Sequence, residues 1–138
     1  MKKLYYFLLA LPILVTIPLS QAVTSTAQET ASLEIAAAAM CTDVVDREPV
    51  GAGDAFEVSL GKVYCFTTIV GSHNPTEVTH VWYFGDIERA RVNLAVNAFS
   101  WRTYSSKRIQ RHEIGDWHVD VLGPGGELLK TLQFKITL

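Results

Sequence analysis

The chain has 138 residues, with 12 basic and 14 acidic side chains and a formal net charge of −2. A net charge this small does not indicate a highly charged partner, and we expect no nucleic acid partner. The length allows one domain of about 100 residues with its own hydrophobic core once terminal segments are set aside.

The first 22 residues predict an export signal. Lys2 and Lys3 precede an almost continuous apolar run from Leu4 to Leu19, and small residues follow up to Ala22. This order is typical of a secretory signal peptide. The run is shorter than the roughly 20 residues of a membrane span. We therefore expect cleavage after Ala22, no stable membrane span after cleavage and a periplasmic or secreted location, with an uncleaved anchor as the alternative.

The next segment predicts a linker. Residues 23–39 are rich in Ala, Thr, Ser and Gln and contain no aromatic residue. The run from Ala36 to Ala39 favours helix, but so short a helix is marginal in water without packing. We expect a flexible or weakly helical linker over 23–39 and a folded domain over 40–138.

From residue 40 onward, apolar residues recur at every second position, which is the period of a half-buried strand. Residues 92–98, 117–121 and 132–138 all alternate in this way. The glycines of 123–126 favour a reversal, so the last two segments predict a hairpin. Seven to eight short strands predict an all-β fold, an antiparallel, immunoglobulin-like β-sandwich, with a small barrel as the alternative. Further strands are expected over 41–45, 55–60, 63–70, 79–84 and 101–109.

Two cysteines, Cys41 and Cys65, are the only ones in the chain. An even number in an oxidising compartment predicts one disulfide. On the chain-entropy model such a bridge would stabilise the fold by roughly 3 kcal/mol. A catalytic thiol is the alternative.

Aromatic and polar residues gather in the middle of the chain and predict a binding surface. Exposed tryptophans on a rigid sheet can hold sugars, because the flat ring meets the apolar face of a pyranose. The alternative is that the tryptophans fill the core, and Trp117, in step with Val119 and Val121, is expected there. The candidate ligand-binding residues are His80, Trp82, Trp101, Arg102, Tyr104 and Lys107.

Basic residues are concentrated over 89–111, where no acidic residue occurs. Guanidinium groups could bind phosphate, sulfate or an acidic sugar through paired hydrogen bonds. Alternatively, neighbouring strands pair these charges with Asp43, Asp46 and Glu48. The residues concerned are Arg89, Arg91, Arg102, Lys107, Arg108 and Arg111.

Metal and catalytic signatures are missing from the sequence. The four histidines, at positions 73, 80, 112 and 118, form no HxH or HExxH pattern, so we expect no metal site and no cofactor. No G-x-S-x-G elbow or glycine-rich phosphate loop is present, which predicts that the protein is not an enzyme. A hydrolase that uses His80 or His118 as base beside Asp120 is the least favoured alternative.

Several islands together resemble the bacterial family catalogued as domain of unknown function 2914. The resemblance extends over about residues 41–136 and implies a compact β domain, alone in exported proteins or attached to other modules, with no established activity or ligand. The islands are Cys41 with Asp46-Arg47-Glu48-Pro49, Val63-Tyr64-Cys65-Phe66-Thr67, His80 with Trp82, Trp101-Arg102-Thr103-Tyr104-Ser105 with Lys107, and Gly115-Asp116-Trp117-His118-Val119 followed by Gly126 and Phe134.

Without a catalytic motif, the sequence favours a binding or accessory module of the bacterial cell envelope. Its partner would be an anionic or saccharide ligand, or an envelope protein. The alternative is a structural domain that pairs with another chain through an edge strand.

Overall fold

The computed structural model describes residue 12 and residues 32–138. Apart from residue 12, the expected signal segment 1–22 lies outside the described residues, as does the first part of the expected linker. No helix in the described part of the chain has the length and apolar character to cross a membrane.

The described residues form ten strands and one short 3-10 turn, so the fold is all-β as predicted. More strands are present than the seven to eight expected. They are β1 (Glu34–Cys41), β2 (Asp43–Val45), β3 (Glu48–Val50), β4 (Ala55–Glu57), β5 (Lys62–Val70), β6 (Thr76–Phe84), β7 (Ile87–Val96), β8 (Ser100–Arg108), β9 (Gly115–Leu122) and β10 (Leu128–Thr137), with the turn at Val58–Leu60.

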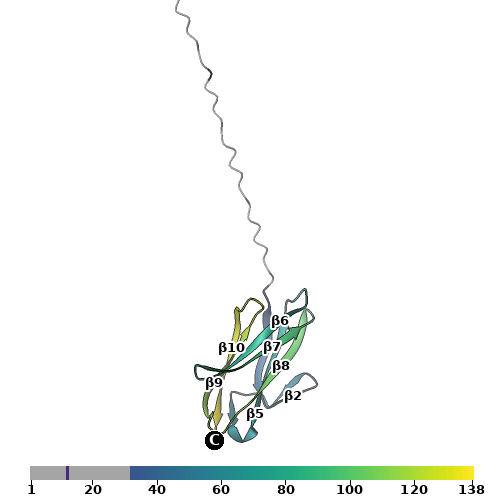
Figure 1. Cartoon of the computed structure of the whole chain (residues 1–138). Helices are drawn as coiled ribbons and strands as arrows, with labels where there is room; N and C mark the ends of the chain where they lie inside the picture. Colours follow the sequence, from purple (N-terminus) through teal and green to yellow (C-terminus); the bar gives the residue numbers. More distant parts are fainter. Residues whose placement is uncertain (1–11, 13–31) are drawn as a thin grey trace, which may run out of the picture.

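Two facing sheets make up a β-sandwich (Figure 1). One sheet has the strand order β1-β5-β8, and the other has the order β4-β10-β9-β6-β7. All neighbouring strands pair antiparallel except β4 and β10, which are parallel. The expected hairpin over 123–126 is confirmed as the β9–β10 connection. Strands β2 and β3 form a separate two-stranded hairpin.

The core lies between the inward faces of the two sheets. Trp117 is 2% exposed, as its alternation with Val119 and Val121 predicts. Its ring centroid lies 5.1 Å from that of Phe84 and 6.0 Å from that of Phe134. Burial of such large aromatic side chains dominates the energy of a core this size.

The linker prediction is wrong over residues 34–39, which belong to β1. This strand pairs antiparallel with β5, from Glu34 opposite Val70 to Cys41 opposite Tyr64. The alanines have weak strand propensity, but pairing with a buried central strand satisfies their backbone groups and overrides it. The domain therefore begins before residue 40.

The disulfide prediction is also corrected, because Cys41 and Cys65 are both free and buried. Cys65 lies opposite Met40 and shares its inward face, whereas Cys41 lies opposite Tyr64 on the other face of the sheet. Successive side chains point to opposite faces of a strand, so the two sulfur atoms are held apart by the sheet itself. Burial raises the pKa of both thiols.

Candidate functional site

Two of the predicted ligand-binding residues lie in the interior. His80 and Trp82 occupy alternate positions of β6 and are both 0% exposed. The prediction that they contact a ligand is therefore wrong for this structure. Their side chains point across the sandwich toward β5 and β8, where they meet polar side chains of the facing sheet.

These interior groups form one hydrogen-bonded chain. The Trp82 indole N–H donates to Ser105 Oγ (3.1 Å), and Ser105 Oγ lies 2.7 Å from His80 Nδ1. On the other side of the ring, His80 Nε2 lies 3.1 Å from Thr67 Oγ1, which donates to the Thr103 carbonyl. All donors find acceptors if Ser105 donates to Nδ1 and Nε2–H donates to Thr67. Burial lowers the pKa of His80 to about 4, so the ring is neutral at pH 7.

A surface pocket contains three other predicted residues. Its volume is about 270 Å³, and it lies where β8 meets the tip of the β2–β3 hairpin and the edge of β7. Arg102 and Tyr104 are about half exposed, and Trp101 is partly exposed. The lining residues are Arg47, Phe66, Ala95, Trp101, Arg102, Thr103 and Tyr104.

The hairpin turn places Arg47 against the pocket. Asp46 and Arg47 both have positive φ, at 51° and 61°, which lets a two-residue turn connect β2 and β3. Arginine rarely adopts this left-handed conformation, and such strain is concentrated at functional sites. The Arg47 guanidinium carbon lies 6.0 Å from the centroid of the Trp101 ring. The turn thus presents a cation beside an aromatic ring.

The same hairpin also holds the Arg102 side chain in place. Its guanidinium pairs with the Glu48 carboxylate and also donates to the Arg47 carbonyl, 3.5 Å away. This is the pairing that the sequence offered as the alternative to ligand binding. Arg47 makes no ion pair within residues 32–138, so its charge is available to a ligand.

Lys107 does not join the pocket. It faces the other side of β8 from Arg102, and its Nζ donates to the Arg108 carbonyl (2.8 Å). The structure therefore brings Trp101, Arg102 and Tyr104 together and separates them from His80, Trp82 and Lys107.

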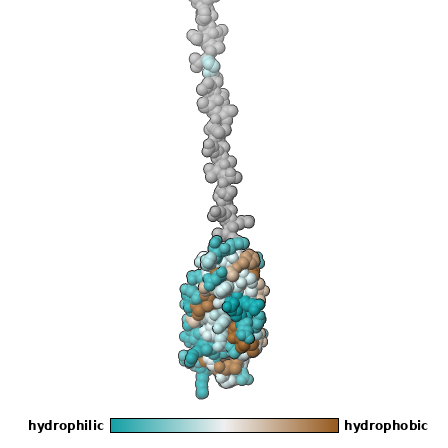
Figure 2. Space-filling view, turned by 90° about the vertical axis from the view of Figure 1, so that its right-hand side faces the viewer, coloured by the Kyte–Doolittle hydropathy of each residue, from teal (hydrophilic) through white to brown (hydrophobic). Residues whose placement is uncertain are grey.

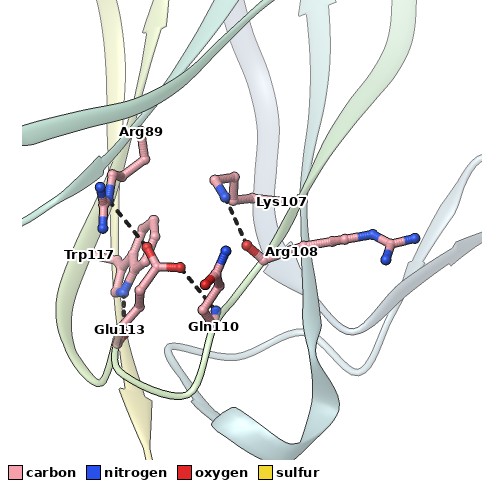
Figure 3. A network of polar contacts seen from close by, with 6 residues as sticks. All are labelled: Arg89, Lys107, Arg108, Gln110, Glu113 and Trp117. Atoms are coloured by element: carbon pink, nitrogen blue, oxygen red, sulfur yellow. Dashed lines mark hydrogen bonds and ion pairs between the residues drawn. The ribbon is translucent and has the colours of Figure 1, made fainter.

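Two other basic residues of the predicted stripe, Arg89 and Arg91, form ion pairs within the same chain. Arg89 Nε lies 3.2 Å from a carboxylate oxygen of Glu113, which is 3% exposed (Figure 3). The Glu113 carboxylate also accepts a hydrogen bond from the Gln110 backbone N–H. The backbone carbonyl of Glu113 accepts a hydrogen bond from the Trp117 indole N–H. This network holds the β8–β9 connection against the core. Arg91, on the same strand as Arg89, pairs with Glu88.

The remaining histidines are dispersed. His118 stacks on Tyr83 on the outer face of the five-stranded sheet, with ring centroids 4.6 Å apart. Asp120 on the same strand accepts from Thr131. His73 lies in the β5–β6 connection against Phe99. Within the described part of the chain, no cluster of three or more His, Cys, Asp or Glu residues could hold a metal ion.

Four of the seven residues that line the pocket were not predicted as ligand contacts: Arg47, Phe66, Ala95 and Thr103. Arg47 was named in the sequence only as part of the Asp46-Arg47-Glu48-Pro49 island, and the structure places it at the tip of the β2–β3 hairpin, where Val44 pairs with Pro49. Phe66 was assigned only to a strand. Two short apolar segments that flank Asp46-Arg47 were the available signal, because a two-residue connection between strands indicates a hairpin.

Comparison with known families supports the resemblance. No curated protein matches the chain. The model of the family described as "Protein of unknown function (DUF2914)" matches residues 75–136, from β6 to β10. The match contains Trp101, Arg102 and Tyr104 but not Arg47. Over residues 75–136 the chain therefore resembles the DUF2914 family, as its sequence islands indicated.

Proposed function

We propose that the chain is an exported, non-catalytic binding module of the bacterial cell envelope, and that its ligand is an acidic saccharide. The observation that carries this proposal is the pocket in which Arg47 and Arg102 lie beside the Trp101 and Tyr104 rings. The export signal predicted over residues 1–22 supports the location.

The chemistry of the pocket supports an acidic sugar. The half-exposed Tyr104 ring can offer a flat apolar face to a pyranose ring, and the Arg47 guanidinium lies over the partly exposed Trp101 ring beside it. Guanidinium groups bind carboxylate or phosphate with two parallel hydrogen bonds. Figure 2 views the molecule from the side on which β8 and the β2–β3 hairpin lie in Figure 1. Hydrophobic and hydrophilic residues lie next to one another there. A surface of this mixed kind suits a ligand that has both apolar faces and charges.

The hydrogen bonding of Ser105 and His80 supports a non-catalytic role. A serine beside a histidine is the arrangement of a nucleophile and its base. Here both residues are buried, and the Ser105 hydroxyl already accepts from Trp82. A substrate carbonyl has no path to this oxygen without separating the two sheets.

The binding test is calorimetry with uronic acid oligosaccharides. We expect the folded wild-type protein to bind them and the Trp101→Ala and Arg47→Ala proteins to bind at least tenfold more weakly, a loss of about 1.4 kcal/mol. Neutral oligosaccharides of the same length should bind less well. Equal binding by wild type and both variants would show that the ligand does not bind in this pocket.

Export is tested separately by fractionation of cells that express the whole chain. We expect the protein outside the cytoplasm, and a chain without residues 2–22 inside it. Recovery of both forms from the cytoplasm would contradict the proposed location.

A second candidate function is pairing through an edge strand. Strand β7 has ten residues and pairs on one side only, with β6. Arg89 and Arg91 lie on this strand, and charged side chains protect an edge against pairing. Edge pairing therefore ranks below ligand binding. A protein that remains monomeric at high concentration, with and without salt, would leave this candidate without support.

A further inference from the structure

On the outer face of the three-stranded sheet, cationic and aromatic side chains extend from the pocket along β8. Residues 102, 104, 106 and 108 share this face, because side chains alternate along a strand. On the neighbouring strand β5, Tyr64 lies opposite Ser106 and Lys62 lies opposite Arg108. The face therefore presents cations and aromatic rings in a continuous strip from the pocket to the end of β8.

Contacts between neighbouring side chains connect this strip. The Tyr104 and Tyr64 ring centroids lie 6.0 Å apart, and Lys62 Nζ lies 5.5 Å from the centroid of the Tyr64 ring. Arg108 is exposed, and Figure 3 shows its side chain extending away from the network around Glu113. Within residues 32–138, neither Lys62 nor Arg108 makes an ion pair. Their charges remain available to a partner.

We propose that this strip and the pocket together hold an extended, linear acidic polysaccharide rather than a single sugar unit. The inference rests on the proposed function, since the pocket forms one end of the strip. Arg108 lies six positions after Arg102 on β8, so the strip is about 20 Å long at 3.3 Å per residue. That length exceeds one sugar ring several times and matches a ligand with several charged units.

An acidic peptide fits the strip less well. An extended peptide gains affinity chiefly from backbone hydrogen bonds to a free sheet edge. The side chains of the strip project from the face of the sheet, and β5 is paired on both sides, with β1 and with β8. Strand β8 is an edge strand, and among the described residues β5 is its single sheet neighbour. A peptide that added a strand at this edge would lie beside the strip rather than across its aromatic rings and cations. Those rings and cations suit charged sugar rings.

The test is the dependence of affinity on ligand length, measured by calorimetry with galacturonate oligomers. We expect the octamer to bind wild type at least tenfold more tightly than the dimer. Tyr64→Ala and Lys62→Ala should each weaken octamer binding about fivefold and leave dimer binding unchanged. These two residues lie beyond the pocket that the dimer occupies.

Matched controls come from the opposite face of the sandwich. Tyr83→Ala removes a stacked ring and Arg91→Ala removes an ion-paired arginine, and neither should change octamer binding. Equal affinity for dimer and octamer, with dimer binding still lost in Trp101→Ala, would contradict binding along the strip and would still support binding in the pocket. Failure of every oligomer to bind would overturn both. Tighter binding of polyglutamate than of the octamer would overturn the assignment to saccharide.

Discussion

The interior around His80 and the surface pocket around Trp101 use the same kinds of side chain for opposite purposes. Strand β8 contributes to both, because Ser105 points inward while Arg102 and Tyr104 point outward. Inside, every buried side-chain nitrogen and oxygen of the described residues has a hydrogen-bond partner. At the pocket, Arg47 makes no ion pair within those residues. Trp101 shares the register of Ser105 and packs against the buried cluster that includes Ile69 and Val78, but its ring stays partly exposed. Exposure, rather than residue type or register alone, therefore separates the cluster that stabilises the fold from the one that is open to a ligand.

The largest expected difference is between the two tryptophans. Trp82→Ala should lower the free energy of unfolding by about 3–5 kcal/mol, because it leaves a cavity in the core. Trp101→Ala should lower it by about 1 kcal/mol, because that ring is partly exposed. Denaturant unfolding of both proteins measures the two losses. If Trp82→Ala does not fold, Trp82→Phe can be compared with Trp101→Phe instead. Equal losses of stability at the two positions would contradict the prediction.

The next difference concerns pH. The pKa of His80 is lowered to about 4 in the folded protein by burial, from an ordinary value of 6.5. The unfolded chain therefore binds the proton more readily between these values, and stability falls as pH decreases from 6.5 to 4. His80 should contribute about 3 kcal/mol to this fall. Unfolding at a series of pH values should show a smaller loss in His80→Gln, and parallel curves for the two proteins would contradict a neutral buried imidazole.

A smaller effect separates two neighbouring serines. Ser105→Ala leaves the Trp82 indole without its acceptor and His80 without a donor, at a cost of about 1–3 kcal/mol. Ser106 is exposed on the other face, so Ser106→Ala should change stability by less than about 0.5 kcal/mol. Thermal unfolding compares them. A similar loss in both variants would show that the interior chain of hydrogen bonds contributes little.

The smallest stability effect is expected at Arg102. Its ion pair with Glu48 is exposed to solvent, and pairs of this kind contribute about 0–1 kcal/mol. Arg102→Ala and Arg91→Ala should therefore unfold at nearly the same denaturant concentration as wild type. Only Arg102→Ala should also weaken uronate binding in calorimetry. A large destabilisation by Arg102→Ala would instead make the hairpin pairing its main role.

Strict alternation made much of the fold predictable. The β9–β10 hairpin and the inward position of Trp117 follow from a period of two and from the glycines between the strands. Strand β1 was not predictable, because a run of alanines has no apolar and polar contrast. Its conformation comes from pairing with β5, a contact distant in sequence.

The pocket was predictable only in part. Trp101, Arg102 and Tyr104 were identified because aromatic and polar residues gather in the middle of the chain. His80 and Trp82 belong to the same gathering but lie in the interior. Alternation separates the two faces of β6 without showing which face is covered by the other sheet. Arg47 was missed because its position depends on a hairpin that packs across β8 and β5, and no local pattern describes that packing.

The most direct measurement is the change in amide and indole NMR signals when a galacturonate oligomer is titrated into the protein. We predict the largest changes at the Trp101 indole, Arg47 and Tyr104, with the Trp82 indole unchanged. Changes centred on Tyr83 and His118, on the outer face of the five-stranded sheet, would contradict this account. So would the absence of any change at saturating oligomer.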